Sequence, residues 1–588
     1  MSSIWLLLLL LYHPLFIVVE ALEKVSSNGD SEAGDANGAA SAGPNEMPSL
    51  NIENGSHSFQ FLEFDWDHVS TPYIAAFWIL LASIAKIVFH KCKKICGIFP
   101  DCALMIMVGL VVGFILYELN FEYSSHSLDS KFFFLYLLSP IIFGAGYFMP
   151  NRTFFDNLGS IVLLTLVGVL WNTFAIGLSL WLVGRTGIFT VETPLLHVLL
   201  FSSLISATDP VAVISLFDEI HVNKLLFTTV FAESLLNDAI SVVLYRLLKS
   251  FLPIGIENMR SADCAAGFLS FFVVALGGVL IGVIWAAIVG FMTRHSKDVD
   301  VVKPVFVFVL PYCAYLAAEM TGLSAIIALV VCGIAMKPYV KLNIPASTMN
   351  SIKYFIKVFA EISEAVIFLF LGLSAVRSHQ WDFPFILLTI IFCVLFRTLG
   401  MIIPAYFLNK FRLVPYSKVD QFVLAYSGNR GPIAFGLVIG LPDSIPAKDL
   451  FITATIAMIY FSVILQGMTL KPLVKWLKIE LDDPNQKSMM EHTLEKQLDF
   501  TMVGLEDICG YRGHHWLRSW FERFSARWLR PLLVDEASVR QQGSKLVREF
   551  TRVALLDAVD IAEGRKPNVS KSSSSLQRLC TQTAECEL

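Results

Sequence analysis

Long apolar runs recur along most of the chain, separated by short polar connections. About thirteen of them approach the roughly 20 residues that a helix needs to cross the hydrocarbon core of a bilayer, although the shortest require local thinning of the membrane. They are 73–90, 103–119, 132–149, 158–183, 194–217, 224–249, 265–292, 303–320, 322–338, 353–376, 383–407, 419–440 and 448–471. The pattern predicts an all-α polytopic membrane protein with a transmembrane domain over residues 71–472.

The two ends of the chain do not follow this pattern. Residues 1–22 hold a short hydrophobic stretch with a cleavage site expected near Ala21, and they predict a signal or hydrophobic start segment. Residues 23–70 are rich in Gly, Ala, Ser and Asn without an apolar period, which predicts a disordered extracellular segment. After the last run we expect a cytoplasmic regulatory region over 473–563 and a disordered tail over 564–588.

Composition supports the membrane class and excludes others. A chain of 588 residues that is 55% hydrophobic and 16% charged cannot hide its apolar side chains in a soluble core, so lipid must cover many of them. The net charge of −5 and the lack of a basic, aromatic-rich stripe before the C-terminal region argue against a nucleic-acid partner. The ten cysteines form no disulfide framework. Cys92 and Cys96 lack a second Cys/His pair, which argues against zinc.

The distribution of Lys and Arg predicts the orientation of the spans. Basic residues gather in alternate connections, around 91–94, 294–303, 337–341 and 410–418, and these connections are expected to face the cytoplasm. The N-terminus then lies outside after signal cleavage, and an odd number of spans leaves the C-terminus inside. The sequon at Asn54 falls outside in this topology, which makes Asn54 a candidate for glycosylation.

Carboxyl groups interrupt two adjacent apolar runs. The first run contains "SATDPVAVISLF" with Asp209 before Pro210, and the second contains "VFAESLLNDAISVVLY" with Glu233 and Asp238. A charged side chain at mid-membrane costs at least about 2.5 kcal/mol, so three carboxyls in two helices indicate a function. Pro210 removes a backbone donor, which predicts that the run 194–217 is a broken helix. Free carbonyls, half-helix ends and a carboxylate together suit a small cation.

A matching break is expected in the other half of the chain. The stretch "AYSGNRGPIAFGL" places Gly428, Gly431 and Pro432 around Arg430, inside the run 419–440. Gly and Pro are common in membrane helices, but an intramembrane arginine beside them favours a functional break over a simple kink. Two broken helices in corresponding halves are typical of transporters built from inverted repeats.

The run 224–249 has two polar faces. Ser234 and Asp238 are four residues apart, as are Glu233 and Asn237, so each pair lies on one side of a helix. Arg397, in the middle of the run 383–407, is the buried partner expected for Glu233, because an unpaired charge there would be costly. We therefore interpret Glu233 as half of a structural ion pair rather than an ion ligand.

The motifs resemble a known family at this point. The run "ATDPVAVISLFDEIHVNKLLFTTVFAESLLNDAISVVLY" is similar to the core of the sodium/proton exchanger family of cation/proton antiporters, animal plasma-membrane type. The stretches "GAGYFMPNRTFFDNLGSIVLL", "EISEAVIFLFLGLS", "QGMTLKPLV" and "GLEDICGYRGHHW" resemble it as well. The resemblance implies a thirteen-helix inverted-repeat fold with two broken crossing helices, a homodimer, and movement of a core domain against a dimerisation domain.

The resemblance also implies roles for single residues. Asp238 would bind Na⁺ and H⁺ in turn, helped by Asp209, Ser234 and the carbonyl of Thr208. The resemblance also places Asn237 among the ion-binding residues, where electrogenic bacterial relatives carry a second Asp. In the family, Glu233 and Arg397 would form a stabilising pair, and Gly428, Arg430 and Gly431 would form the second helix break.

These roles predict an electroneutral antiporter that takes in extracellular Na⁺ and exports cytosolic H⁺ by alternating access. We expect it to need no cofactor and not to be an enzyme. The sequence contains no nucleotide-binding motif, which argues against an ATP-driven pump. Relatives typically show "PPIILDAGYF" where this chain has "SPIIFGAGYF", so a carboxylate is missing at Gly144. This departure leaves open a K⁺(Na⁺)/H⁺ exchanger of altered selectivity, and a channel or a non-transporting pH sensor remain alternatives. Glu319 and Glu364, also inside spans, fit an ion path and structural hydrogen bonding equally well.

The region after the last run predicts a partner-binding helix over 515–533. Its large aromatic residues recur in four-residue steps with Arg between them, as in a basic amphipathic helix. Trp516, Trp520, Phe524 and Trp528 follow these steps, and Phe521 stands beside Trp520 as a further candidate for partner binding. Such a helix suits either anionic lipid or the groove of an EF-hand protein. The family resemblance favours a calcineurin-B homologous protein.

Overall fold

The computed structural model describes most of the chain between residues 66 and 535. The described residues are 66–91, 99–119, 130–209, 213–214, 217, 220, 222–255, 260–296, 299, 302–376, 379–412, 414–477, 489–510 and 514–535. The predicted signal segment 1–22, the sequon at Asn54, Pro210 and the tail 564–588 lie outside these residues.

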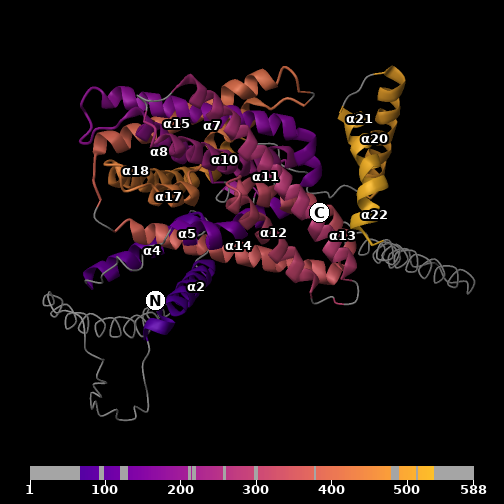
Figure 1. Ribbon diagram of the computed structural model, residues 1–588, viewed down its shortest axis with the longest axis horizontal. Helices are drawn as coiled ribbons and strands as arrows, with labels where there is room; N and C mark the ends of the chain where they lie inside the picture. The colour runs from indigo at the N-terminus through magenta and orange to yellow at the C-terminus, as the bar shows by residue number, and fades with distance from the viewer. Residues whose placement is uncertain are drawn as a thin grey trace, which may run out of the picture. The chain divides into compact units, whose positions relative to one another are not determined.

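The described part of the chain is built from helices and contains no strand (Figure 1). The helices before the middle of the chain are α2 (Trp66–Lys91), α4 (Asp101–Glu118), α5 (Ser130–Phe132), the π-helix η2 (Phe133–Leu138), α6 (Ser139–Phe148), α7 (Asn151–Gly184), α8 (Leu195–Ile205), α10 (Lys224–Phe251) and α11 (Ser261–His295). They are followed by α12 (Lys303–Met320), α13 (Ala325–Asn343), α14 (Ala346–Ser374), α15 (Phe383–Leu408), α16 (Lys418–Tyr426), α17 (Pro432–Ile439), α18 (Lys448–Tyr460), the π-helix η3 (Phe461–Gln466) and α19 (Gly467–Trp476). The C-terminal helices are α20 (Met489–Cys509), α21 (His514–Phe524), the π-helix η4 (Ser525–Leu529) and α22 (Arg530–Leu533).

Each of the predicted apolar runs contains helix, but not every run is one long span. Within the described residues, nine helical segments are long and apolar enough to cross a membrane. Two further runs hold shorter apolar helices, Ala76–Phe89 and Leu195–Ile205. The run 419–440 is split between α16 and α17, and α14 carries four charged residues, Lys353, Lys357, Glu361 and Glu364. Taken together, these segments agree with about thirteen membrane helices.

Some helix boundaries differ from the predicted runs. α7 begins at Asn151 and α14 at Ala346, each several residues earlier than expected, and a proline precedes each of them. A proline at that point disfavours further helix on its N-terminal side, so it fixes the start. α2 begins at Trp66, inside the segment 23–70 that we predicted to be disordered. A polar first turn is compatible with helix even though it carries no apolar period.

Contacts between residues divide the chain into two compact units. The first comprises residues 1–84 and 115–126, and the second comprises 85–114 and 127–588. Every residue that the sequence places at the ion centre belongs to the second unit.

The helices of the second unit pack in two groups (Figure 1). We call α7, α8, α10 and α15–α19 the central bundle, because α7 packs on α8, α10 and α15, and α17 packs on α18. We call α5, η2, α6 and α11–α14 the flanking bundle, in which α13 packs on α6, α11 and α12. A buried apolar cluster holds the central bundle together; it includes Leu164, Leu226, Val230, Met401, Val423, Leu470 and Val474. Burial of such side chains stabilises the bundle without fixing any chemistry.

The C-terminal helices α20, α21, η4 and α22 follow one another along the chain. α20 and α21 lie side by side, and the chain is helical from His514 to Leu533. This range agrees with the amphipathic helix predicted over 515–533.

Candidate ion-binding centre

Two helix breaks meet inside the central bundle. α8 ends at Ile205, and the chain continues to Asp209 without helical structure. The other break separates α16 from α17 between Tyr426 and Pro432. The backbone N–H of Asp209 donates to the carbonyl oxygen of Asn429 at 2.7 Å, so the two breaks are hydrogen-bonded to each other.

Gly431 allows this close approach. A Cβ atom at Gly431 would lie 2.7 Å from Cγ of Asp209, which is closer than atoms of folded proteins pack. Any larger residue would therefore push Asp209 away from the second break. From the sequence, we interpreted the glycines of this stretch as a helix break. The structure shows that Gly431 is also needed for close packing against Asp209.

Arg430 closes the C-terminal end of α8. Its guanidinium Nη1 donates to the carbonyl oxygen of Ser206 at 2.5 Å and to that of Ala207 at 3.5 Å. The last carbonyls of a helix have no partner within the helix and carry partial negative charge, so a cation there is favourable. The side chain of Arg430 is 1% exposed. The positive charge in the membrane is thus explained by the helix end that it caps.

The π-helix η3 supplies two contacts to the second break that we did not predict. Ser462 Oγ accepts from the backbone N–H of Arg430 at 3.1 Å and donates to its carbonyl at 3.2 Å. Gln466 Nε2 donates to the carbonyl oxygen of Tyr426, the last residue of α16. Wide π-helical turns are frequent at functional sites. In the sequence, Ser462 and Gln466 are two of several polar residues in the run 448–471, so they gave no distinct signal.

Asp238 lies where α10 passes the first break. Its carboxylate accepts a hydrogen bond from the backbone N–H of Thr208, and Asp209, Glu233 and Arg430 lie close enough to act on it electrostatically. The side chains of Asp238 and Asp209 are 6% and 7% exposed. Two buried carboxyls therefore lie within electrostatic reach of each other, beside the end of α8 that Arg430 caps.

Two buried hydroxyls beside these carboxyls have no hydrogen-bond partner among the described residues. They are Thr208 Oγ1, on the break, and Ser234 Oγ, one turn before Asp238 on α10. Buried polar atoms are rarely left unpaired, and an unpaired oxygen is free to coordinate a cation. No group of three or more His, Cys, Asp and Glu side chains suited to a metal ion occurs in the described part of the chain. Hydroxyl and carboxylate oxygens are the ligands that a hard cation prefers.

The other polar face of α10 is fully hydrogen-bonded. Asn237 Nδ2 donates to Glu233 Oε1 at 3.2 Å, and Ser241 Oγ donates to Asn237 Oδ1 at 3.1 Å. Ser241 also lies 3.2 Å from the hydroxyl of Ser206 at the end of α8. Asn237 was predicted beside the ion, but both of its polar atoms are engaged along its own helix face. Ser241 was missed, although its spacing of four from Asn237 marks the same face.

Glu233 is paired with Arg397 as the sequence predicts. Arg397 Nη1 and Nη2 donate to the two carboxylate oxygens of Glu233 at 2.8 and 2.7 Å, and both side chains are buried. This geometry satisfies two charges at once in a low-dielectric environment. A Cβ atom at Gly428 would lie 3.0 Å from Cζ of Arg397, so Gly428 leaves room for the guanidinium beside the second break.

Comparison with known proteins decides the family. The family described as "Sodium/hydrogen exchanger, transmembrane" matches residues 79–476. The chain belongs to the sodium/hydrogen exchanger family. The matched residues include the central bundle and the flanking bundle. The chain is therefore a multi-pass membrane protein of a cation/proton antiporter family.

Several curated relatives are similar over most of this exchanger chain. It is 48% identical over 510 residues to the probable Na(+)/H(+) antiporter nhx-9 of Caenorhabditis elegans, covering 86% of this chain and 76% of that protein. It is 42% identical over 534 residues to sodium/hydrogen exchanger 3 of Homo sapiens, covering 90% of this chain and 64% of that protein. It is 42% identical over 530 residues to human sodium/hydrogen exchanger 5, covering 89% of this chain and 59% of that protein.

A solved structure shares the fold of this exchanger. The sodium proton antiporter MjNhaP1 from Methanocaldococcus jannaschii is 19% identical, with a TM-score of 0.52, and the match covers 70% of this chain and 99% of the antiporter. At this identity the likeness concerns the fold alone. It agrees with the all-helical antiporter architecture predicted from the paired helix breaks.

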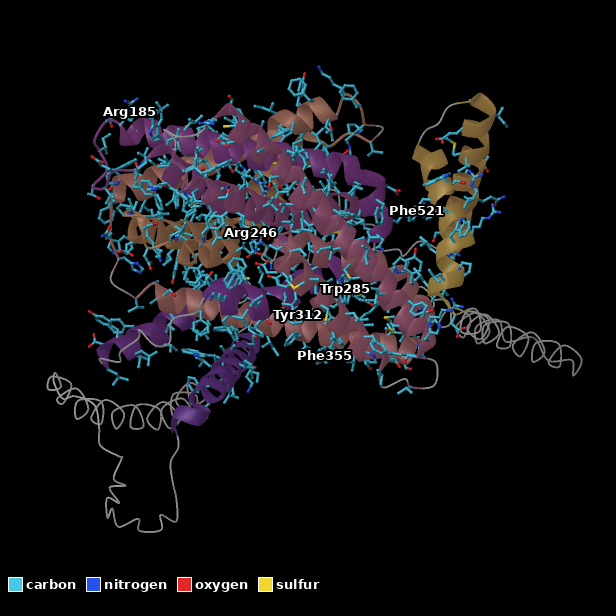
Figure 2. The ribbon with its side chains drawn as sticks, in the orientation of Figure 1. Arg185, Arg246, Trp285, Tyr312, Phe355 and Phe521 are labelled. Atoms are coloured by element: carbon cyan, nitrogen blue, oxygen red, sulfur yellow. The ribbon has the colours of Figure 1, made fainter. Side chains whose placement is uncertain are left out.

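The two further carboxyls of the exchanger lie in the flanking bundle. Glu319 accepts from Arg246 Nη2 at 2.6 and 2.7 Å, and both side chains are partly exposed. Arg246 is labelled in Figure 2. Glu364 accepts from the thiol of Cys102 at 3.4 Å and lies within electrostatic reach of Asp209. Glu319 therefore has an ion-pair partner, whereas the hydrogen bond that Glu364 accepts comes from a neutral thiol. A Cβ atom at Gly144 would meet Cβ of Ala360 at 3.3 Å, one turn before Glu364.

The predicted partner-binding aromatics of the exchanger are exposed on the C-terminal helices. Phe521 is labelled on α21 in Figure 2. The exposed fractions of the side chains are 52% for Trp520, 55% for Phe521, 41% for Phe524 and 65% for Trp528. The rings of Trp520 and Phe524 are stacked at 5.8 Å. The side chain of Trp516 lies outside the described residues.

Proposed function

We propose that this protein is an electroneutral sodium/proton antiporter that exchanges extracellular Na⁺ for cytosolic H⁺ by alternating access. In this account Asp238 binds either Na⁺ or a proton. Asp209, Thr208 and Ser234 complete the cation site. The inward Na⁺ gradient then drives acid out of the cell, which serves intracellular pH and Na⁺ homeostasis.

The observation that carries this proposal is the pairing of one buried carboxylate with unpartnered oxygens at the crossing of two helix breaks. Asp238 accepts from Thr208 N–H, and the hydroxyls of Thr208 and Ser234 have no partner among the described residues. Na⁺ is a hard cation that prefers such oxygen ligands. A carboxylate that must give up its proton to take the cation performs exchange of one for the other.

The positions of the charges support electroneutral exchange. With Asp238 as the exchanging group, the site has the same charge with Na⁺ bound as with H⁺ bound. Asn237 is uncharged and is hydrogen-bonded to Glu233 and Ser241, so it adds no second exchangeable proton. Glu233 is held as the ion pair with Arg397. One Na⁺ for one H⁺ is the stoichiometry that this arrangement supports.

Recovery of intracellular pH after an acid load tests the function. In cells lacking other exchangers, external Na⁺ should restore pH and external K⁺ should not. Recovery with K⁺ at a comparable rate would favour the alternative of a K⁺(Na⁺)/H⁺ exchanger. This alternative rests on Gly144, which stands where relatives typically have a carboxylate. No recovery with either cation, from a protein present at the surface, would favour a pH sensor without transport.

The cellular setting is also part of the proposal. We place the protein in the plasma membrane as a homodimer, with the N-terminus outside and the C-terminus in the cytoplasm. The alternation of basic connections supports this orientation, and an exposed sequon at Asn54 would be glycosylated in it. Removal of N-linked glycan from the wild type, but not from Asn54→Gln, tests the outer position of the N-terminal segment.

The C-terminal helix is proposed to bind a calcineurin-B homologous EF-hand protein. Large exposed aromatics dominate binding in such grooves, and four of them stand exposed between 520 and 528. Trp520→Gln with Phe524→Gln should release the subunit, whereas Arg523→Gln with Arg527→Gln should mainly weaken binding to anionic liposomes. Co-purification of an EF-hand subunit with each double variant measures the difference. Retention by the aromatic variant would favour the lipid surface as the binding partner.

A further inference from the structure

The last turn of the C-terminal helices contacts the flanking bundle. α22 packs on α11, next to the C-terminal end of α13 (Figure 1). Asn343, the last residue of α13, is 4% exposed, and its Nδ2 donates to the carbonyl oxygen of Leu533 at 2.7 Å. Its Oδ1 accepts from the backbone N–H of Asp535 at 2.9 Å. One side chain thus holds two points of the tail backbone.

Arg294, near the end of α11, completes the contact. Its Nη1 donates to the carbonyl oxygen of Leu532 at 2.9 Å and to that of Pro531. Three successive carbonyls at the end of α22 are therefore satisfied by side chains from α11 and α13. The end of a helix leaves such carbonyls without partners within the helix, and a cation there is favourable. The tail helix is capped by the membrane part of the protein.

An apolar contact accompanies these hydrogen bonds. Leu533 and Val534 are 2% and 5% exposed, in contrast to the exposed aromatics earlier in the tail. A Cβ atom at Gly290 of α11 would lie 3.3 Å from Cβ of Leu533, so the glycine provides the space that Leu533 occupies. Polar caps and a buried leucine at one place are the marks of a specific interface rather than a chance touch.

The two ends of the tail belong to different bundles. The chain leaves the central bundle through α19, where Leu470 and Val474 are packed into the cluster with Leu226 and Val423. It reaches the flanking bundle at residues 530–535. The segment between these points carries the exposed aromatic face. Movement of one bundle against the other would therefore change the distance or the angle between the two attachment points of the tail, α19 and residues 530–535.

From these contacts we infer that residues 530–535 are a docking segment, which fixes the C-terminal helices to the ends of α11 and α13 and ties the flanking bundle to the central bundle. A protein bound on the aromatic face acts on the exchanger through this dock. The effect on transport rests on the proposed antiport, whereas docking itself is independent of it.

Cleavage of the purified full-length protein tests the dock. A specific protease site is inserted between residues 480 and 487, and the cut protein is separated by size-exclusion chromatography in detergent at high salt. The fragment carrying α20–α22 should stay with the membrane part in the wild type. It should be released in Leu533→Asp and in Arg294→Ala with Asn343→Ala. Release of the wild-type fragment, or its retention in Leu533→Asp, would overturn the dock.

A matched control and a transport readout sharpen the result. Ser525→Ala removes only the peripheral contact with Tyr339 at 3.4 Å, so its fragment should be retained. Leu533→Asp lies in the tail and leaves the helices of both bundles unaltered. At equal surface abundance, acid extrusion by Leu533→Asp should differ from that of Ser525→Ala by about twofold or more. An equal rate in the two variants, with the tail released in one, would overturn the coupling while leaving the antiport unaffected.

Discussion

Two faces of α10 stand one residue apart and differ in how their polar groups are used. On one face, Glu233, Asn237 and Ser241 form a closed chain of hydrogen bonds that begins at Arg397. On the other face, Ser234 Oγ has no partner among the described residues, and Asp238 accepts from the backbone of the broken helix α8. Both faces are buried.

The difference separates stability from chemistry on a single helix. The closed face satisfies its charges and amides within the protein, so its loss should be felt in folding. The open face keeps oxygens without partners, which costs stability and leaves ligands for a cation. Substitutions that exchange the behaviour of the two faces would break this account.

The largest effect is expected for Asp238→Asn. Asn cannot release a proton in exchange for a cation, so Na⁺-dependent acid extrusion should fall to the background rate while the protein still reaches the membrane. Intracellular pH recovery and surface biotinylation measure the two properties together. Robust Na⁺-dependent extrusion by this variant would place the exchanging group elsewhere.

The closed face should respond in stability. Arg397→Ala leaves Glu233 buried alone, which should cost about 3–5 kcal/mol and strongly reduce surface expression. Glu233→Gln should act in the same direction by leaving the guanidinium without its carboxylate. Thermal unfolding of the purified variants, followed by loss of the monodisperse peak, measures the loss. Wild-type heat stability of Arg397→Ala would contradict the structural role of the pair.

Ser241→Ala should cause a smaller loss of the same kind. It removes the donor to Asn237 Oδ1, and a buried acceptor left without a partner costs about 1–3 kcal/mol. The apparent affinity for Na⁺ should be unchanged, because Ser241 belongs to the closed face. The Na⁺ dependence of the exchange rate at fixed pH gives the affinity. A weakened affinity at full stability would assign Ser241 to the ion site instead.

Ser234→Ala is the matched variant on the open face and should have the smallest effect. Ser234 and Ser241 are both serines on α10, and both are 0% exposed. Loss of one neutral oxygen ligand should weaken the apparent Na⁺ affinity by about fivefold, the equivalent of about 1 kcal/mol. Its thermal stability should not fall below the wild-type value, because no hydrogen bond within the described residues is lost. The opposite pattern in the two serine variants would reverse the assignment of the faces.

The sequence predicted those parts of this centre that contain charged residues, because a charged side chain inside a membrane is energetically costly. Carboxyls and arginines within apolar runs indicated both breaks and the pair of Glu233 with Arg397, because such residues are not retained in a membrane without a use. Single neutral residues gave no comparable signal. Ser462 and Gln466 are ordinary polar residues in an apolar run, and their contacts with the second break exist only because η3 packs beside it.

The sequence also could not predict where a side chain directs its hydrogen bonds, or which residues far apart in the chain come into contact. Four-residue spacing placed Asn237 with Glu233, but the family resemblance suggested the ion site, and only the packed helix shows both amide atoms engaged. The contact of Asn343 with Leu533 joins residues 190 positions apart, so no local pattern could predict it. Tertiary packing determines such contacts.

The most direct test of the central claim is proton release on Na⁺ binding to the purified protein. Titration with Na⁺ in weakly buffered solution, followed with a pH indicator, should release about one proton per Na⁺ bound in the wild type and in Ser241→Ala. Asp238→Asn should bind Na⁺ weakly and release none. Stoichiometric release from Asp238→Asn would contradict the assignment of exchange to the open face of α10.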